Sequence, residues 1–163
     1  MNYLLHAVIV GTLATVVMDL WTTLRRHWLG VAGLDYALLG RWVGHLARGQ
    51  FRHAAIAQSA PVAGERLLGL ATHYLIGITF AALLLAIWGA QWLQHPTLAP
   101  ALIIGIATVV APFLILQPAM GAGIAAARTP APAKARMHSL ITHTIYGLGL
   151  FLAGWIDHLL FLR

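Results

Sequence analysis

The residues of this chain that could carry chemistry are polar side chains placed inside apolar stretches. Asp19, His73 and His143 each interrupt a long run of apolar residues, and Gln117 ends another such run. Ionisable side chains inside a membrane are costly, and they mark binding sites and proton relays. We therefore treat these four residues as the candidate ligand-binding or proton-binding set.

Their spacing predicts that the four residues share one depth. Asp19, His73 and His143 each lie six or seven residues from an arginine at the end of their apolar stretch. At a rise of 1.5 Å per residue, each side chain starts about 9–11 Å inside the end of its helix. Gln117 lies eleven residues before Arg128, at a comparable or slightly deeper level. The sequence predicts one polar layer near one face of a helical bundle.

Such a layer fits several kinds of chemistry. Two histidines and a carboxylate, here His73, His143 and Asp19, could coordinate a divalent transition metal. The two histidines could instead hold a b-type haem between their axial nitrogens. Asp19 and a histidine could also exchange a proton in a relay. The structural alternative is a set of hydrogen bonds that holds the helices together.

The composition indicates that the elements positioning this layer lie in a lipid bilayer. Of 163 residues, 60% are hydrophobic and only 9% are charged, whereas soluble domains average about 25% charged residues. A chain of this size has too little interior to hide so much apolar surface from water. An ordinary soluble domain and a disordered chain are therefore excluded. The chain also lacks cysteine, which excludes disulfides and thiolate chemistry.

Four apolar stretches approach or exceed the length of about 20 residues that a membrane-spanning helix needs. They cover residues 3–24, 67–90, 98–116 and 139–162. The first is longer than the apolar segment of a signal peptide and has no basic residue before it, so we expect it to remain as an uncleaved span. The predicted fold class is an all-α bundle of four transmembrane helices, with residues 1–163 forming a single membrane domain.

Basic residues are concentrated in two of the connections. Residues 25–66 contain six arginines and residues 128–138 contain three basic residues, whereas residues 91–99 contain none and the C-terminal end contains only Arg163. The positive-inside rule then places the first two segments in the cytoplasm and both termini on the non-cytoplasmic side. The net charge of +6 is explained by this topology, and we expect no nucleic-acid partner.

The second and fourth stretches share the pattern Arg-x5-Thr-His-x3-Gly. It covers residues 66–77 and recurs, at an offset of 70 residues, over residues 136–147. The first and third stretches share a weaker Ala-Thr-Val-Val match. We expect two tandem helical hairpins, residues 3–90 and 98–162, related by an axis along the membrane normal. Chance similarity between apolar helices is the alternative.

The long connection over residues 25–66 contains an amphipathic pattern. An apolar residue recurs there at every fourth position: Leu34, Leu38, Trp42 and Leu46. This pattern predicts a helix lying in the inner membrane interface. Arg41 and Arg48 lie off the apolar stripe, where they would contact anionic lipid headgroups. A helix that caps the bundle is a compatible alternative.

The third stretch is expected to be discontinuous at its end. Pro118, Gly121 and Gly123 follow directly on Gln117, and a proline followed by glycines interrupts a helix. A broken helix at membrane depth is tolerated where it is buried or lines a cavity. Pro112 predicts a second, milder bend.

Three further polar residues lie near the predicted outer ends of the first and fourth stretches. His6 lies close to the start of the first, and Asp157 and His158 lie close to Arg163 at the end of the fourth. Side chains at these depths can reach the headgroup region. We expect all three to face the interface.

Short motifs are spread over nearly the whole chain. They are Met18-Asp19-Leu20-Trp21, Leu34-Asp35-Tyr36, Gly40-Arg41-Trp42, Gly64-Glu65-Arg66, His73-Tyr74, Gln117-Pro118 with Gly121 and Gly123, Arg128-Thr129-Pro130, and His143. Together they resemble a family of small four-span bacterial membrane proteins known only as a domain of unknown function. The resemblance implies a location in the bacterial inner membrane. It implies no activity and no catalytic residues.

The function predicted from the residues is a small transporter, or a small-molecule-binding or proton-binding protein, that uses the polar layer. A haem-binding redox protein and a structural or partner-binding subunit are the alternatives. We do not expect an enzyme, because Ser59 and Ser139 lie in no nucleophile motif. Besides the lipid bilayer, a second copy of the chain is an expected partner, since four helices leave little room for a private pathway. The ligand, a small molecule or an ion, is not identified by the sequence.

Overall fold

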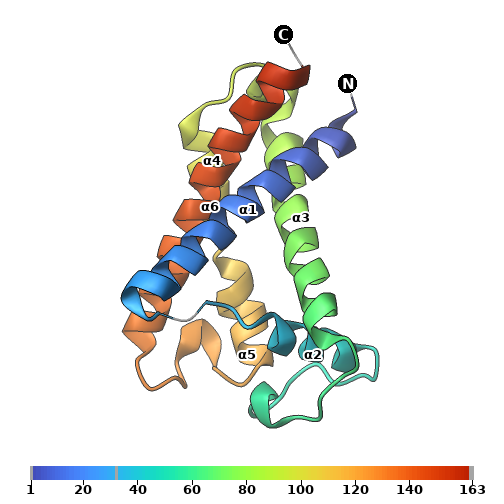
Figure 1. Ribbon diagram of the computed structural model, residues 1–163, viewed down its shortest axis with the longest axis vertical. Coiled ribbons are helices and arrows are strands. Elements are labelled where there is room, and N and C mark those ends of the chain that lie inside the picture. The colour runs from blue at the N-terminus through green and yellow to red at the C-terminus, as the bar shows by residue number, and fades with distance from the viewer. Residues whose placement is uncertain (1, 32, 162–163) are drawn as a thin grey trace. The chain divides into compact units, whose positions relative to one another are not determined.

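Every regular element in the described part of the chain is helical (Figure 1). The computed structural model describes residues 2–31 and 33–161. The helices are α1 (Tyr3–Leu29), α2 (Tyr36–Leu46), α3 (Glu65–Gln94), α4 (Leu98–Ala107), α5 (Gln117–Ala119) and α6 (Pro132–Phe161). Two 3₁₀ turns, η1 (Ile56–Gln58) and η3 (Ile124–Ala126), and a π-helical turn, η2 (Pro112–Leu116), complete the set. The predicted all-helical class is confirmed.

Four helical segments of the described residues are long and apolar enough to cross a membrane. They are Tyr3–Leu29, Glu65–Gln94, Leu98–Ala119 and Pro132–Phe161. Their most apolar windows have mean hydropathies between 1.4 and 2.4, which suits a hydrocarbon solvent. The chain is therefore a multi-pass membrane protein, as its composition predicts.

Local sequence explains where α1 and α2 begin and end. The side chain of Asn2 accepts a hydrogen bond from the amide of Leu5 at the start of α1, at 3.3 Å. Gly30 ends this helix with a φ of +64°, a left-handed conformation that glycine adopts at little cost. Asp35 accepts a hydrogen bond from the amide of Ala37 at 2.9 Å and so caps α2.

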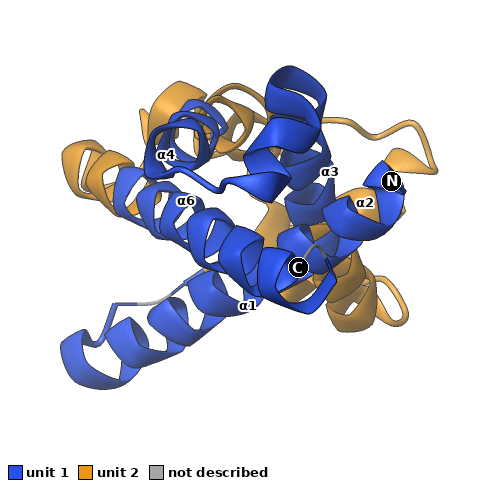
Figure 2. Cartoon of the chain, turned by 90° about the horizontal axis from the view of Figure 1, so that it is seen from above, with its two compact units in different colours: residues 1–33, 74–108, 140–163 blue, residues 34–73, 109–139 orange. Residues whose placement is uncertain are grey.

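The chain divides into two compact units (Figure 2). Unit 1 contains residues 1–33, 74–108 and 140–163, and unit 2 contains residues 34–73 and 109–139. Helices α3 and α6 contribute residues to both units.

Unit 1 has an apolar core to which α1, α3, α4 and α6 all contribute. Its most deeply buried side chains are Val10, Ala14, Ala81, Leu84, Leu93, Ala101, Leu150 and Ala153. Half of these are alanines. Small side chains allow helices to approach closely, which is the main source of van der Waals contact between helices in lipid.

Glycines bring two helix pairs of unit 1 into backbone contact. A Cβ atom on Gly11 of α1 would lie 2.5 Å from the Cα of Ile78 in α3. A Cβ atom on Gly105 of α4 would lie 2.5 Å from the Cα of Gly147 in α6. Carbon atoms do not pack at this distance, because the optimum is about 3.5–4.0 Å. These two crossings therefore exclude any side chain.

A threonine follows each of these glycines in the next helical turn. The hydroxyl of Thr15 donates a hydrogen bond to the carbonyl of Gly11 at 2.7 Å, and that of Thr108 donates to the carbonyl of Gly105 at 2.8 Å. Each bond satisfies a hydroxyl inside an apolar environment. The α1–α3 and α4–α6 crossings thus share a glycine–threonine element.

The third span is interrupted at both places that the sequence predicts. After α4 the chain turns at residues 108–109 and passes through η2 before its last turn, α5. Pro112 opens the π-helical turn, where its missing amide hydrogen disturbs the regular hydrogen-bond ladder. Pro118 lies in α5, the helix ends at Ala119, and Gly121 and Gly123 follow with φ of +98° and +76°. The span therefore ends where Gln117 and Pro118 predict, and the bend at Pro112 is a π-helical turn.

Unit 2 is held together by a second glycine contact and by a short backbone pairing. A Cβ atom on Gly40 of α2 would lie 2.6 Å from the amide nitrogen of Gly69 in α3. The amide of His53 donates to the carbonyl of Ala119 at 2.9 Å, and the amide of Ile56 donates to the carbonyl of Met120 at 3.1 Å. Helix α2 and the loop after it are therefore bound to other parts of unit 2.

The glycine crossings predict a steep cost for added volume. We expect Gly11→Val to destabilise the protein by about 1–3 kcal/mol, the usual cost of overpacking a tight core, because the new side chain would meet the backbone of α3. Thermal unfolding in detergent measures this. Leu20→Ala is the control, since Leu20 lies in the same helix and is 65% exposed. Equal melting temperatures for the two variants would contradict the prediction.

Candidate functional site

Asp19 is held inside unit 1 by a tyrosine of α3. The hydroxyl of Tyr74 donates a hydrogen bond to Oδ2 of Asp19 at 3.1 Å. Both residues are partly exposed. The carboxylate is thus oriented by a neighbour and still reachable by water or by a small ligand. This combination of a fixed position and access is what exchange of a proton requires.

His143 of α6 has a tautomer that its neighbours assign. Its Nδ1 lies 3.1 Å from the hydroxyl oxygen of Thr108 and 3.1 Å from the carbonyl of Gly105. Because the Thr108 proton is already directed at that carbonyl, Nδ1 must be the donor. The neutral imidazole then keeps its lone pair on Nε2. His143 is therefore equipped to accept a proton through Nε2.

The expectation that His6 and Asp157 face the headgroups is wrong. Nδ1 of His6 lies 2.8 Å from Oδ2 and 3.0 Å from Oδ1 of Asp157. The side chain of Asp157 is 0% exposed and that of His6 is 7% exposed. The two groups satisfy each other between α1 and α6, so they can be buried where neither could be buried alone. His158 packs edge-on against Trp155, and Arg163 lies outside the described residues.

The other two members of the predicted layer belong to unit 2. The rings of His73 and Tyr36 have their centroids 4.9 Å apart. Nε2 of Gln117 donates to the hydroxyl of Ser139 at 3.3 Å, while its Oε1 is buried without a partner. Each of the four residues has neighbours within its own unit. Their convergence on one layer stays a prediction.

A metal or haem site at these residues also stays a prediction. In residues 2–31 and 33–161, no three histidine, aspartate or glutamate side chains are grouped so that they could hold a metal ion. The ring of His73 lies beside that of Tyr36, and Nδ1 of His143 lies within hydrogen-bond distance of the Thr108 hydroxyl.

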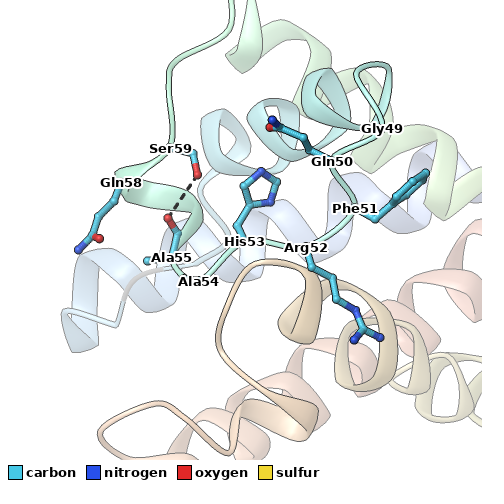
Figure 3. Close-up of a pocket in the computed structure, with 9 residues that line it drawn as sticks. All are labelled: Gly49, Gln50, Phe51, Arg52, His53, Ala54, Ala55, Gln58 and Ser59. Atoms are coloured by element: carbon cyan, nitrogen blue, oxygen red, sulfur yellow. Dashed lines mark hydrogen bonds between the residues drawn. The ribbon is translucent and has the colours of Figure 1, made fainter.

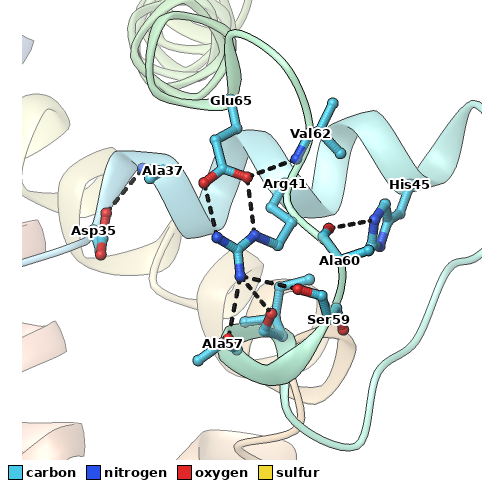
Figure 4. A network of polar contacts seen from close by, with 10 residues as sticks. Asp35, Ala37, Arg41, His45, Ala57, Ser59, Ala60, Val62 and Glu65 are labelled. Carbon is cyan, nitrogen blue, oxygen red and sulfur yellow. Dashed lines mark hydrogen bonds and ion pairs between the residues drawn. The ribbon is translucent and has the colours of Figure 1, made fainter.

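Arg41 organises a polar network in unit 2 (Figure 4). Its Nη2 and Nε donate to the two carboxylate oxygens of Glu65 at 2.8 and 2.9 Å, a bidentate pairing of the kind that arginine makes best. Its Nη1 donates to the carbonyls of Ser59 and Ala57 at 3.1 and 3.2 Å. Hydrogen bonding to Glu65 raises the pKa of Arg41. One side chain therefore ties α2 to η1 and to the start of α3.

This network changes the role expected for Arg41. Its side chain is only 12% exposed, and its donors point at groups of the protein instead of at lipid. The carboxylate of Glu65 accepts a further hydrogen bond from the amide of Val62 at 3.0 Å, which fixes the loop on the other side. Arg48 is exposed, and its contact with headgroups stays a prediction.

A pair of histidines, one near the end of α2 and one in the loop after it, is not among the site residues predicted from the sequence. Nδ1 of His45 lies 2.8 Å from Nε2 of His53, and Nε2 of His45 lies 3.1 Å from the carbonyl of Ala60. A carbonyl only accepts, so in the neutral pair His45 donates through Nε2 and His53 donates to His45. Nδ1 of His53 keeps its lone pair and is buried without a partner.

His53 also lines an open pocket of about 600 Å³, formed by residues 49–55 with Gln58 and Ser59. Figure 3 shows the His53 ring on one side of this loop segment and the Arg52 side chain on the other. The sequence gives no signal for the pair, because a separation of eight residues across a loop has no fixed geometry.

A family model described as "Protein of unknown function (DUF2938)" matches residues 8–157. The match covers nearly the whole chain, and the chain belongs to this family. It confirms the resemblance that the short sequence motifs indicate. No curated protein and no solved structure matches the chain. The family brings no assigned activity, so the argument for function rests on the residues described above.

The Arg41 network predicts a local change when its acceptor is neutralised. In Glu65→Gln the amide can no longer receive two charge-assisted bonds from the guanidinium. We expect faster hydrogen exchange at the amides of residues 56–62, measured by mass spectrometry on the purified protein. Arg48→Gln is the control, because Arg48 is exposed and should leave this exchange unchanged. Unaltered protection in Glu65→Gln would show that the network does not hold the loop.

Proposed function

We propose that this member of the DUF2938 family is a small proton-coupled transporter of the bacterial inner membrane, with Asp19 as its proton-binding group. The observation that carries the proposal is a carboxylate on a membrane-spanning helix that is bonded to Tyr74 at 3.1 Å and is still partly exposed. An acidic group that serves only as glue between helices has no need of such access. Ionisable residues in spans mark ion and substrate pathways.

His143 is the second participant in the proposed relay. It lies in the same unit as Asp19, and the donors and acceptors around it leave Nε2 free to take a proton. His73 and Gln117 are the candidates within unit 2, on the basis of their depth in the sequence. The unpartnered Oε1 of Gln117 offers an acceptor for a small-molecule ligand.

The repeated glycine–threonine element supports two tandem hairpins as the architecture. Gly11 contacts α3 beside Gly77, whereas Gly105 contacts α6 at Gly147. Gly77 and Gly147 are 70 residues apart, which is the offset of the shared sequence pattern. Internal repeats of this kind are common in transporters. We propose that α1 and α3 form the first hairpin and α4 and α6 the second.

The distribution of basic residues supports an orientation with both termini on the non-cytoplasmic side. In this orientation α2 and the loop after it face the cytoplasm. We propose that α2 lies in the inner interface, because exposed apolar side chains lie just before it and in the loop after it. Leu34 is 43% exposed, and the nearby Phe51 is 64% exposed. Arg48 would contact headgroups beside them.

Two other functions stay open as hypotheses. A bis-histidine haem protein would show a Soret band that His143→Ala weakens, and a coloured purified sample would favour it over the transporter. A structural subunit, acting with a partner or as a homo-oligomer, would show no proton flux at all.

Replacing the carboxylate of Asp19 by an amide is expected to stop proton movement. We expect proteoliposomes of the native protein to take up protons under an inside-negative potential when a small-molecule cell extract is present outside. An entrapped pH-sensitive dye measures the uptake. Asp19→Asn should abolish the uptake with an unchanged melting temperature, because the amide still accepts the Tyr74 hydrogen bond but takes up no proton. Asp35→Asn, at the cap of α2, is the control and should behave as native. Equal uptake by Asp19→Asn and the native protein would contradict the proposal.

The orientation is testable because the chain has no native cysteine. We expect His95→Cys, in the connection between α3 and α4, to react with a membrane-impermeant thiol reagent in intact spheroplasts. Gln58→Cys should react only after the membrane is permeabilised. The opposite pattern would place the basic connections outside and overturn the orientation.

A further inference from the structure

We propose that His6 and Asp157 form a second proton-binding site, at the non-cytoplasmic end of unit 1. This proposal rests on the proposed function, because it supplies the outer site that a proton-coupled transporter with an inner site at Asp19 requires. We call the two residues the outer pair.

The geometry of the outer pair suits a shared proton. Both oxygens of Asp157 lie within 3.0 Å of the same imidazole nitrogen, Nδ1 of His6. A proton can therefore lie on the nitrogen or on an oxygen with little movement of either side chain. The partners come from the first and last spanning helices, so the site exists only while α1 and α6 are in contact.

The burial of the pair favours one proton. An isolated ionised carboxylate in an apolar environment is very unfavourable, and Asp157 is 0% exposed. A neutral imidazole already carries one ring proton. When the pair holds one further proton, its overall charge is zero, whether that proton lies on His6 or on Asp157. Such a pair exchanges its proton as a unit, and its titration belongs to both members.

The unequal exposure of the two side chains indicates the route of exchange. His6 keeps 7% of its side-chain surface exposed, whereas Asp157 keeps none. A proton from outside binds Nε2 of His6, and the proton on Nδ1 passes to Oδ2 of Asp157. The imidazole ends neutral and the carboxyl ends protonated, so charge and protons balance.

The spacing of the two sites gives the pair a role distinct from that of Asp19. His6 and Asp19 are 13 residues apart on α1, or about 20 Å at 1.5 Å per residue, in a bilayer core about 30 Å thick. Between them, Val10 and Ala14 are 0% exposed, and Gly11 touches the backbone of α3. This tightly packed segment separates the outer pair from Asp19.

Few other titratable groups lie near the outer pair. On α1, the described neighbour is Tyr3. On α6 it is His158, whose ring packs against Trp155. His95, just after α3, is exposed, and the first two turns of α4 carry no titratable side chain. Within residues 2–31 and 33–161, the ends of the helices at this site contain no lysine, arginine or glutamate. Among the described residues, proton exchange at this site is therefore assigned to the pair itself.

The test is nuclear magnetic resonance of the full-length protein in lipid vesicles. The aspartate carboxyl carbons and the histidine ring nitrogens are labelled. Spectra are recorded from about pH 4 to pH 9, which spans the ordinary pKa range of both side-chain types. The chain contains only three aspartates, so Asp157→Asn assigns the Asp157 signal and His6→Gln assigns that of His6. We expect the two signals to change together in one transition. His95→Gln is the control and should leave that transition in place.

Two results would overturn the outer pair. The signals could stay constant over the whole series, which would make the pair a fixed ion bridge, or they could change in separate transitions, which would make the groups independent. If Asp157→Asn fails to fold, Asp19→Asn and Asp35→Asn assign the other two aspartates and leave the Asp157 signal by elimination. The flux assay separates the two proposals. If Asp19→Asn abolishes proton uptake while the outer pair does not titrate, the proposed function stands and the outer pair is structural. If the pair titrates but no uptake occurs, only the proposed function falls.

Discussion

Unit 1 depends on direct contact between the backbones of neighbouring helices, which its glycines make possible. Because a bilayer offers no hydrophobic drive for one apolar helix to meet another, association relies on closeness of approach and on hydrogen bonds between helices. Gly11 and Gly105 provide the closeness. At this close approach, polar groups on neighbouring helices form hydrogen bonds. Tyr74 with Asp19 and Tyr146, whose hydroxyl donates to the carbonyl of Gly77 at 2.6 Å, are examples.

Unit 2 uses the opposite chemistry for the same purpose. Its organising group is a charged side chain, Arg41, which binds Glu65 and carbonyls of the loop that contains the 3₁₀ turn η1. Loop carbonyls need partners wherever water is scarce, and one guanidinium can serve several of them. The histidine pair His45–His53 continues this arrangement to the carbonyl of Ala60. A loop held in this way can keep the pocket beside His53 open.

The sequence predicts the features of this molecule that depend on composition and periodicity. Four apolar stretches of adequate length lead directly to four spanning helices, because length and hydropathy are local properties. What it misses depends on which helices are neighbours. His6 and Asp157 are 151 residues apart, and nothing local distinguishes a buried pair from two interfacial side chains. Arg41 likewise lies off the apolar stripe of α2, and this position alone predicts contact with lipid. The structure instead pairs Arg41 with Glu65. The interruptions of the third span are predicted correctly, because prolines and glycines act locally. Pro112 opens the π-helical turn, and the helix ends at Ala119, just after Pro118.

The scarcity of acidic groups has a consequence for the environment of the protein. Asp19, Asp35, Glu65 and Asp157 are the four acidic residues in the sequence, and each has a partner inside the protein. With ten basic residues against these four, at least six positive charges have no acidic counterpart anywhere in the chain. Their counter-ions must come from the surroundings, and the nearest fixed negative charges beside a membrane protein are lipid phosphates. The surroundings of this protein thus complete its charge balance, and they form a part of its electrostatics that the polypeptide alone does not contain.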